Sequence, residues 1–277
     1  SCAKQYKGAH QNVLEFHTES FVADVSQYMY LPPKQHRAKT CMFERNVSRH
    51  DQGDWSIGMY FGDRLESLRP MEEDDRFKIE TGCGFLDTTS PKNPVIQVGD
   101  IYDIPSLFVA DPFLQIGPLD GHIYMLFESL DMAFRGFIGA AVSKDVGVSW
   151  TYLGAALEET FHLSFPYTFC ENDMCYMIPE AHKSDSVRLY QTKSNKFPFG
   201  WKFSHALLEG AWYQDTGLVK HDEHWYLFTT TAMQPNEWRQ RLYVSDSLRG
   251  PYVEHPHSPV THLSESCTRG RLGGRII

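Results

Sequence analysis

A unit of about 51 residues recurs along the chain, and this period constrains the fold more than any other feature. Three tyrosines, Tyr124, Tyr176 and Tyr226, mark the same place in the three copies and lie 52 and 50 residues apart. A large aromatic residue follows in each copy, at Trp150, Trp201 and Tyr252. A short motif precedes each tyrosine: Ala110-Asp-Pro-Phe, Ser164-Phe-Pro-Tyr and Gln214-Asp-Thr-Gly. Three markers in one order at one period indicate a structural repeat.

Each copy contains four short runs rich in β-forming residues, separated by turns of Gly, Asp, Pro and Ser. In the first copy we expect strands at residues 108–115, 122–129, 137–143 and 149–153. A four-stranded unit of roughly 40 to 50 residues is typical of a β-propeller blade. Neighbouring blades bury both faces of each sheet, so Trp150 and Trp201 are expected to lie between blades. A β-sandwich is the competing all-β fold, but it has no reason to repeat at this spacing.

The period divides the chain into two parts. Residues 1–50 are polar, rich in His and Lys and without pattern, and we predict a stem or linker there. Residues 51–277 are predicted to form the propeller domain, with three full units and two partial ones. Residues 271–277 look like the opening strand of a further blade, so we expect a propeller that is incomplete at its C-terminus.

The composition argues against several functions. The net charge is −9, from 26 basic and 35 acidic residues, and without a basic patch we expect no nucleic-acid partner. No stretch of about 18 apolar residues exists, so we expect no membrane span in this chain. Neither a Gly-x-Ser-x-Gly nucleophile elbow nor a glycine-rich phosphate loop occurs, and we expect no cofactor and no metal site. The aromatic content of 14% fits both strands and sugar-binding surfaces.

Two of the six cysteines, Cys170 and Cys175, bracket the turn-rich residues 171–174 between two apolar runs. This pattern predicts a hairpin whose strand ends face each other, a geometry that a disulfide can bridge. The spacing does not match a zinc knuckle, which needs a second pair of ligands. The disulfide and a single glycosylation sequon at Asn46 favour the secretory pathway, with the Golgi lumen or the extracellular space as the expected location.

Seven motifs, taken in order, resemble one family. They are Trp55-Ser-Ile-Gly, Asn93-Pro-Val, Phe108-Val-Ala-Asp-Pro-Phe, Phe161-His-Leu-Ser-Phe-Pro, Tyr176-Met-Ile-Pro-Glu, Asp246-Ser-Leu-Arg-Gly-Pro and Arg271-Leu-Gly-Gly-Arg. Over about residues 54–277 the chain is similar to the N-terminal domain of plant glucosamine inositolphosphorylceramide transferases and its bacterial and algal relatives. That domain is similar in turn to the five-bladed propellers of family 43 glycoside hydrolases. In the plant proteins a separate glycosyltransferase domain follows; nothing in this chain resembles it, so we expect it only as a partner in a full-length protein.

Two aspartates hold equivalent positions in the repeat. Cleavage of a glycosidic bond needs two carboxyl groups that flank the bond. The inner strands of a propeller converge on its axis, so carboxylates at one repeat position point to one shared site. Asp111 and Asp215 hold this position, whereas the second unit has Phe165. They resemble the base and the pKa-modulating aspartate of family 43 enzymes, with Asp111 as the base. The alternative is an Asp that starts a strand as a turn former.

The general acid has no direct counterpart. In family 43 it is a glutamate of the blade after the modulating aspartate, where this chain has two glycines. Glu180 and Glu128 lie at matched positions after the second strand of their units and are candidates to replace it. We expect Glu180 near the two aspartates but farther from the axis, and Glu128 as a substrate-binding residue. The alternative for Glu180 is a structural role, satisfied by a neighbouring blade or by Arg188.

Four further residues are candidates for sugar binding. His162 precedes Phe-Pro-Tyr in the second unit and is expected to hydrogen-bond a hydroxyl, unless it is structural. Trp212 and Tyr213 precede Asp215 and are expected to stack on a sugar face, unless they belong to the core. Arg271 is expected to bind an anionic sugar or phosphate, or to close the ring by an ion pair.

These observations predict a carbohydrate-active propeller domain that acts on a glycan or glycolipid head group, either hydrolase-like or associated with a glycosyltransferase. Its expected catalytic set is Asp111, Glu180 and Asp215, which would act by general acid–base catalysis. The alternative is a non-catalytic glycan-binding propeller that lost the acid and kept the aromatic residues. A protein-interaction propeller would present an apolar face poor in carboxylates, against which Asp111 and Asp215 argue.

Overall fold

The computed structural model describes residues 55–61, 69–70, 77–81, 84–88, 93–234, 237–260 and 271–276. The predicted stem at residues 1–50 and its sequon at Asn46 lie outside these residues. Two short strand pairs precede the main body: β1 (Tyr60–Phe61) with β2 (Arg69–Pro70), and β3 (Phe77–Thr81) with β4 (Gly84–Thr88).

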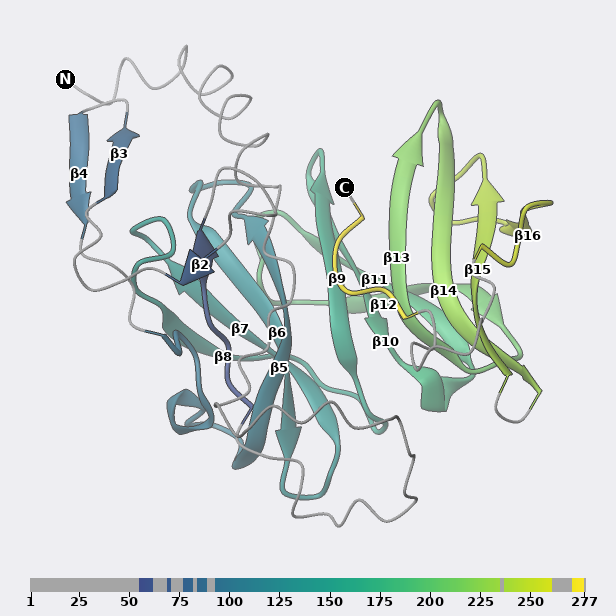
Figure 1. Cartoon of the computed structure of the whole chain (residues 1–277), viewed down its shortest axis with the longest axis horizontal. Coiled ribbons are helices and arrows are strands. Elements are labelled where there is room, and N and C mark those ends of the chain that lie inside the picture. Colours follow the sequence, from purple (N-terminus) through teal and green to yellow (C-terminus); the bar gives the residue numbers. More distant parts are fainter. Residues whose placement is uncertain are drawn as a thin grey trace.

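Three antiparallel sheets of four strands form the main body, each a meander in which consecutive strands are neighbours (Figure 1). The first blade contains β5 (Ser106–Ile116), β6 (Ile123–Asp131), β7 (Gly136–Ser143) and β8 (Thr151–Leu157). The second contains β9 (Ser164–Glu171), β10 (Met174–Glu180), β11 (Ser186–Lys193) and β12 (Lys202–Glu209). The third contains β13 (Tyr213–His221), β14 (His224–Gln234), β15 (Glu237–Ser245) and β16 (Val253–Glu254).

The first strands of neighbouring blades contact one another, β5 with β9 and β9 with β13, and we call them the inner strands. The described residues include the 3₁₀ turns η3 (Val98–Asp100) and η4 (His182–Ser184). Within the described ranges, no helix is long and apolar enough to cross a bilayer.

The predicted four-stranded unit is confirmed in all three copies. In the first copy the observed strands match the expected ones closely, except that the fourth starts two residues later and extends to Leu157. Three complete blades lie within the described residues, so a total of five and an incomplete last blade stay predictions. Residues 271–276 differ from the expectation: they form no strand, and they lie against the inner strands instead.

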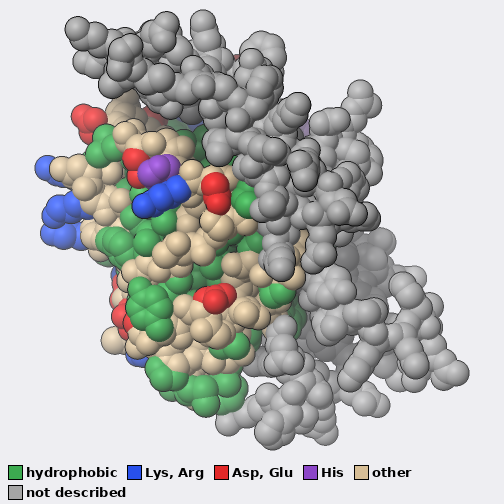
Figure 2. All heavy atoms as spheres, turned by 90° about the vertical axis from the view of Figure 1, so that its left-hand side faces the viewer, with side chains coloured by type: hydrophobic (Ala, Val, Ile, Leu, Met, Phe, Trp, Pro, Cys, Tyr) green, Lys and Arg blue, Asp and Glu red, His purple; other side chains and the backbone are tan. Residues whose placement is uncertain are grey.

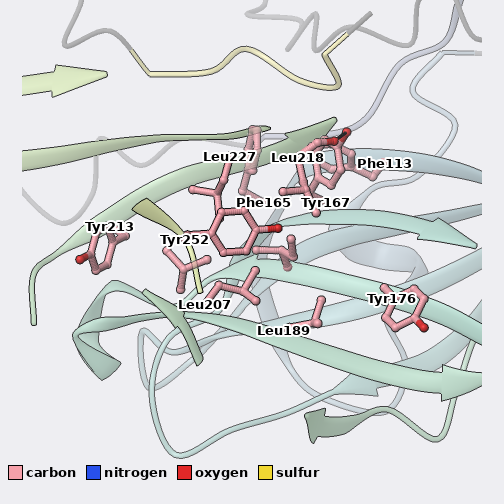
Figure 3. Packing of buried hydrophobic residues seen from close by; sticks show 12 residues of the cluster. Phe113, Phe165, Tyr167, Tyr176, Leu189, Leu207, Tyr213, Leu218, Leu227 and Tyr252 are labelled. Carbon is pink, nitrogen blue, oxygen red and sulfur yellow. Dashed lines mark hydrogen bonds between the residues drawn. The ribbon is translucent and has the colours of Figure 1, made fainter. Parts of the chain in front are cut away.

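The first and second blades bury both faces of their sheets, because side chains alternate along their strands. In β10, Cys175 and Met177 pack toward the first blade, whereas Tyr176 and Ile178 pack toward the third. Figure 3 shows the layer between the second and third blades, to which β9 and β13 contribute aromatic and aliphatic side chains. The alternation therefore produces a continuous stack of layers rather than a single core.

The outer face of the first blade is covered by the segments that precede it. Ile57 and Ile96 form an isolated antiparallel bridge, and both are buried. Together with Met59 they pack in one cluster with Met125 and Phe127 of β6. The first blade is thus enclosed on both faces within the described part of the chain.

Of the two tryptophans expected between blades, Trp201 lies there, buried between the first and second blades, whereas Trp150 lies on the outer face of the first blade, in the cluster that contains Ile57 and Ile96. Both indole N–H groups donate to the backbone oxygen three residues earlier, at 2.7 Å for Pro198 and 3.1 Å for Gly147. Tyr252 is buried between the second and third blades. The aromatic residues that recur at one period in the sequence therefore pack against the sheet of each blade in the structure.

The surface around the first blade carries charges of both signs. Figure 2 shows acidic and basic side chains scattered among apolar and polar groups on this side of the molecule. Isolated surface charges of this kind contribute little to stability. The ionisable groups with unusual surroundings are buried near the inner strands.

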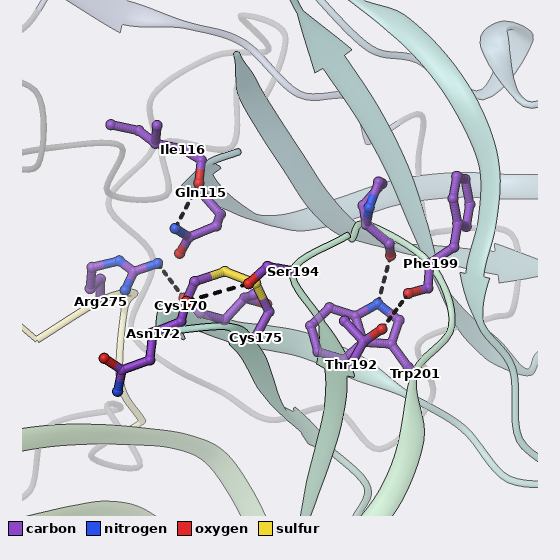
Figure 4. The surroundings of a disulfide bond; sticks show 12 residues. Gln115, Ile116, Cys170, Asn172, Cys175, Thr192, Ser194, Phe199, Trp201 and Arg275 are labelled. Atoms are coloured by element: carbon purple, nitrogen blue, oxygen red, sulfur yellow. Dashed lines mark hydrogen bonds between the residues drawn. A yellow bond between two sulfur atoms is a disulfide. The ribbon is translucent and has the colours of Figure 1, made fainter. Parts of the chain in front are cut away.

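The predicted disulfide joins Cys170 in β9 to Cys175 in β10 (Figure 4). The two residues are directly paired across the hairpin, with Cα atoms 4.0 Å apart. The strands are connected by Asn172 and Asp173, and Asn172 has a φ of 55°. Asn tolerates this left-handed backbone better than most residues, so the turn brings the two cysteines together without a glycine.

Removal of the disulfide is expected to lower the free energy of unfolding by about 2 kcal/mol, because closing so short a loop restricts the unfolded chain by that amount. The double variant Cys170→Ala/Cys175→Ala is compared with the wild type by urea unfolding without reductant. Peptide mapping of the wild type establishes the link. Two free thiols in the mapped peptides, or a double variant as stable as the wild type, would contradict this expectation.

Candidate functional site

The inner strands of the three blades bend at one equivalent position. Pairing with the neighbouring strand shifts register there, and the residues at the bend, Asp111, Phe165 and Asp215, have φ of 50°, 45° and 48°. Asp adopts this left-handed conformation more readily than Phe. Bulges of this kind re-aim a side chain and are frequent beside active sites. The repeat therefore presents two aspartates in the same way from the first and third blades.

A buried glutamate lies beside the bend in the first and second blades. Glu128 in β6 is paired with Ala110, and Glu180 in β10 is paired with Ser164. Glu128 is 6% exposed and Glu180 is 5% exposed, so both carboxylates need partners within the protein. The third blade has Thr230 at the corresponding position. We call Asp111, Glu128, Glu180 and Asp215 the carboxylate cluster.

Arg271 joins the second and third blades. Its Nε and Nη2 donate to the two oxygens of Asp215, the second at 2.8 Å to Oδ1, which is a bidentate pair. The same Nη2 lies 3.5 Å from Glu180 Oε2, and the backbone N–H of Asp215 donates to that oxygen at 3.3 Å. Glu180 thus contacts Asp215 directly, rather than lying farther out as expected. Of the two roles expected for Arg271, the ion pair is the one observed.

Each glutamate of the carboxylate cluster also contacts the ring of a histidine. His162 Nε2 lies 3.2 Å from Glu128 Oε1, and His182 Nδ1 lies 2.9 Å from Glu180 Oε1. The backbone N–H of Gly136 donates to His162 Nδ1 at 2.9 Å, so the ring of His162 is held from two sides. The two imidazole rings are neighbours, with centroids 6.1 Å apart. Two histidines and the carboxylate cluster therefore form one connected group.

Burial raises the pKa of Asp111 to about 8, and the negative charges of Glu128, Asp215 and Glu180 add to this effect while Arg271 opposes it. The expectation that clustered acids raise one another's pKa holds for this residue. Asp111 consequently keeps its proton at neutral pH.

The pKa values of the two carboxyl groups that contact Arg271, those of Asp215 and Glu180, shift in opposite directions. Burial raises the pKa of Asp215 to about 7, with help from Glu180 and against the effect of Arg271. Burial also disfavours the charge on Glu180, but the hydrogen bonds from His182 and Asp215, together with the charge of Arg271, lower the pKa of Glu180 overall. Glu180 is therefore the ionised carboxylate, in contrast to the expectation for a cluster of acids.

Of the two predicted aromatic sugar contacts, only Trp212 lies beside the cluster. Its ring is 55% exposed and meets the ring of His182 edge-on at 6.0 Å. Tyr213 is buried between the second and third blades, and its hydroxyl donates to the backbone oxygen of Glu209 at 3.1 Å. Tyr213 is the first residue of β13 and is buried, whereas Trp212 precedes the strand and is exposed. The sugar contact predicted for Tyr213 is therefore corrected to a role in the core.

Arg188 is not the partner of Glu180. Its guanidinium lies 4.0 Å from the ring centre of Phe203, and its Nε donates to the hydroxyl of Tyr190 at 2.9 Å. His182 takes that place instead, and the sequence had not indicated it. The only available signal was its position two residues after Glu180, because the repeat has no histidine at this place in the other copies.

The segment that carries Arg271 crosses the inner strands of all three blades. Arg275 Nη2 donates to the backbone oxygens of Leu114 in β5 at 3.1 Å and Thr168 in β9 at 2.6 Å. On β13 the segment packs on Gly217, where a Cβ atom would come within 2.8 Å of it. The side chains of Leu272 and Ile276 occupy the space that a side chain at Gly217 would take.

The site offers a protonated carboxyl, an ionised carboxylate, an imidazole and an exposed indole ring. Proton transfer and hydrogen bonding to hydroxyl groups are within reach of this set. Across the described ranges of the chain, no three His, Cys, Asp or Glu side chains are placed to share a metal ion.

Comparison with known sequences assigns the chain to a family. The sequence profile described as "Glucosamine inositolphosphorylceramide transferase 1, N-terminal" matches residues 47–277. The chain belongs to this family. It is 34% identical over 233 residues to glucosamine inositolphosphorylceramide transferase 1 of Oryza sativa subsp. japonica, covering 82% of this chain and 30% of the relative. The Arabidopsis thaliana protein of the same name is 32% identical over 265 residues, covering 93% of this chain and 33% of the relative.

The chain thus spans about a third of the length of these glucosamine inositolphosphorylceramide transferases. Among solved structures, an exo-β-1,3-galactanase from Clostridium thermocellum has a similar fold, with a TM-score of 0.54 and 14% identity over 75% of this chain and 44% of that chain. At this identity the likeness concerns the fold. It supports the interpretation of the three four-stranded sheets as propeller blades, and the family resemblance expected from the seven motifs is confirmed.

The raised pKa values of Asp111 and Asp215 predict that the domain loses stability as the pH rises. Unfolded, both groups release their protons near pH 4, whereas folded they keep them to about pH 8 and about pH 7. The folded state binds more protons in this interval, so stability falls with pH, by at most about 1.4 kcal/mol per pH unit for each group. Glu180 acts in the opposite sense, but only at more acidic pH, because its pKa is lowered. The urea midpoint is expected to be lower at pH 8 than at pH 5.5.

The variant Asp111→Asn removes one of these titrations and keeps the size of the side chain. We expect its stability relative to the wild type to be greater at pH 8 than at pH 5.5, because the cost of keeping Asp111 protonated grows with pH between about 4 and 8. Asp222→Asn is the matched control, since Asp222 lies in a turn with its side chain 86% exposed, and should not change the pH dependence. A wild-type midpoint that does not fall between these two pH values would show that the carboxyl groups are solvated.

Proposed function

We propose that this domain is a carbohydrate-active propeller that binds a glycan or glycolipid head group at its inner strands and transfers protons to and from it. The observation that supports this most is the contact of Glu180 with Asp215 and Arg271, whose charges act on a protonated Asp111 of the first blade. Proton transfer to a sugar needs such a pairing of a protonated and an ionised group. Because the matched relatives are named glucosamine inositolphosphorylceramide transferases, the head group of such a glycolipid is one candidate ligand.

Asp111 is the proposed general acid. With a pKa of about 8 it is protonated at neutral pH and can protonate the oxygen that leaves from the sugar. The role of base, which the family 43 resemblance implies, requires an ionised carboxylate, and Asp111 becomes one only at higher pH. Glu180, which is ionised and is held in place by Arg271, supplies fixed negative charge beside the positive sugar ring of the transition state. Trp212 provides an exposed ring on which a sugar face can stack.

Glycan binding without catalysis is the second candidate function. Arg271 contacts both oxygens of Asp215 and one oxygen of Glu180, so these two carboxylates are already engaged within the protein. In that case Trp212 and Asp111 would hold a sugar while no bond is broken. Binding and hydrolysis must therefore be measured separately.

We also propose the setting in which the domain works. The disulfide of the second blade supports the secretory pathway, in the Golgi lumen or outside the cell, because disulfides persist in oxidising compartments. Since the chain spans 30% and 33% of the two plant relatives, a separate transferase domain in a full-length protein is the proposed partner. The resemblance to family 43 supports a ring of five blades, to which the three described blades would belong.

The test begins with a glycan array and continues with hydrolysis of methyl glycosides of the sugars that bind. The panel includes β-1,3-linked galactose oligosaccharides, because an enzyme of similar fold is an exo-β-1,3-galactanase, and inositol phosphate glycosides of glucosamine. We expect kcat/KM to fall as the pH rises through about 8, where Asp111 loses its proton. Asp111→Asn should lower kcat/KM by about 10²- to 10⁴-fold, the usual contribution of a general acid.

Asp222→Asn again serves as the control and should keep the wild-type rate and pH profile. If the wild type binds glycans on the array but hydrolyses none of them, the second candidate function replaces the first. If it neither binds nor hydrolyses any member of the panel, both candidates are wrong. Melting temperatures of each variant separate loss of chemistry from loss of folding.

A further inference from the structure

His182 lies next to the carboxylate cluster, in a backbone turn that hydrogen bonds hold closed. It is the first residue of η4 and follows Glu180 by two positions. Backbone hydrogen bonds close the turn, from Ser184 to Ala181 at 2.8 Å and from Asp185 to His182 at 3.1 Å. The hydroxyl of Ser184 also donates to the backbone oxygen of Ala181 at 2.7 Å. The position of the imidazole ring is therefore set by a closed turn and not by a loose loop.

The contact with Glu180 sets the tautomer of His182. Glu180 is ionised, since its pKa is lowered, and an ionised carboxylate can only accept a hydrogen bond. His182 Nδ1 therefore donates to Glu180 Oε1 at 2.9 Å, and the lone pair of the ring lies on Nε2. This Nε2 has no hydrogen-bond partner in the described part of the chain.

His162, whose ring neighbours that of His182, has no free ring nitrogen. The N–H of Gly136 donates to His162 Nδ1, so the hydrogen of this ring lies on Nε2, which is 3.2 Å from Glu128 Oε1. Both nitrogens of His162 are thus occupied, and its ring is a structural link between the first and second blades. Of these two adjacent rings, only that of His182 has a nitrogen that can accept a proton from a ligand.

The surroundings of His182 suit a group that meets a sugar. Its side chain is 22% exposed, so solvent and ligands can reach it. Trp212, the exposed ring proposed to stack on a sugar, lies edge-on to it at 6.0 Å. On its other side, Glu180 is held by Arg271 and by the backbone of Asp215. A carboxylate bound on both oxygens cannot itself turn toward a ligand, but it can stabilise a charged imidazole.

We propose that His182 is the general base of the site, a role that rests on the proposed function of the domain. Nε2 of His182 takes a proton from the water molecule that attacks the anomeric carbon, and Asp111 gives its proton to the leaving oxygen. The bond from the anomeric carbon to the leaving oxygen breaks as the bond to the water oxygen forms. Glu180 positions the ring and stabilises the imidazolium, and exchange of one proton with solvent restores His182 and Asp111.

The prediction that His182 Nε2 carries a free lone pair can be tested without a substrate. Diethyl pyrocarbonate acylates imidazole nitrogens that have a free lone pair, and peptide mapping reports the rate at each histidine of the folded protein. We expect His182 to react more than tenfold faster than His162, because only His182 has a free Nε2. Equal rates at the two residues would overturn the assignment.

The role in turnover is tested with His182→Asn, whose amide N–H can still donate to Glu180 although no base remains. On a 4-nitrophenyl glycoside that the wild type hydrolyses, kcat/KM should fall by about 10²- to 10⁴-fold. Sodium azide needs no deprotonation, so it should restore turnover and yield the glycosyl azide. The control is His205→Asn, the same change at an exposed position of β12, which should stay within about twofold of the wild type.

The outcomes separate the two proposals. If the wild type hydrolyses a glycoside and folded His182→Asn does so at the same rate, His182 is not the base, although the proposed function stands. Loss of turnover without rescue by azide would make His182 a structural residue and would also overturn the assignment. If the wild type hydrolyses no glycoside of the panel, the proposed catalysis is wrong and the base role falls with it.

Discussion

The guanidinium of Arg271 lies between two buried carboxylates from different blades, and the rest of the site depends on this contact. Asp215 is 2% exposed and Glu180 is 5% exposed, and charges buried to this extent are costly without a partner. Arg275, four residues later, ties the same segment to the first and second blades through backbone oxygens. One irregular segment therefore compensates the charge of the site and connects three blades. In the described part of the chain Asp111 has no ion pair with Arg271, so burial dominates its pKa.

The repeated blades form the framework of the site. Its ionisable groups differ because equivalent positions of the three blades carry different residues. All three inner strands bend with the same left-handed residue, but Phe165 fills the second position where the other blades have aspartate. Phe165 is buried and packs on Phe113, so it contributes to the core and leaves the site to its neighbours. In the same way the glutamate of the first two blades becomes Thr230 in the third. A perfectly repeated sequence would have placed identical groups around the site, with no difference in protonation among them.

The blades, the disulfide and the proximity of Glu180 to Asp215 could be predicted from the sequence, because a fixed period places equivalent residues in equivalent positions. The direct contact between these two residues could not, since Glu180 was expected farther from the axis. His182 could not, since it has no counterpart in the other copies and its role depends on a single hydrogen bond to Glu180. The path of residues 271–276 could not be predicted either. It depends on backbone acceptors more than a hundred residues away and on the open surface at Gly217. Trp212 and Tyr213 could not be told apart, because strand β13 begins between them and only the strand decides which ring is buried.

The protonation state of Asp111 depends at once on its burial, on the convergence of the blades and on the position of Arg271. Measuring it is therefore the most direct test that the carboxylate cluster forms. A carbon-13 NMR titration of the side-chain carboxyl carbon, assigned by comparison with Asp111→Asn, measures it in the intact domain. We expect a midpoint near pH 8, shifted further upward when Arg271 is replaced by glutamine. A midpoint near pH 4, the ordinary value for an aspartate, would mean that Asp111 is solvated and that the carboxylate cluster does not form.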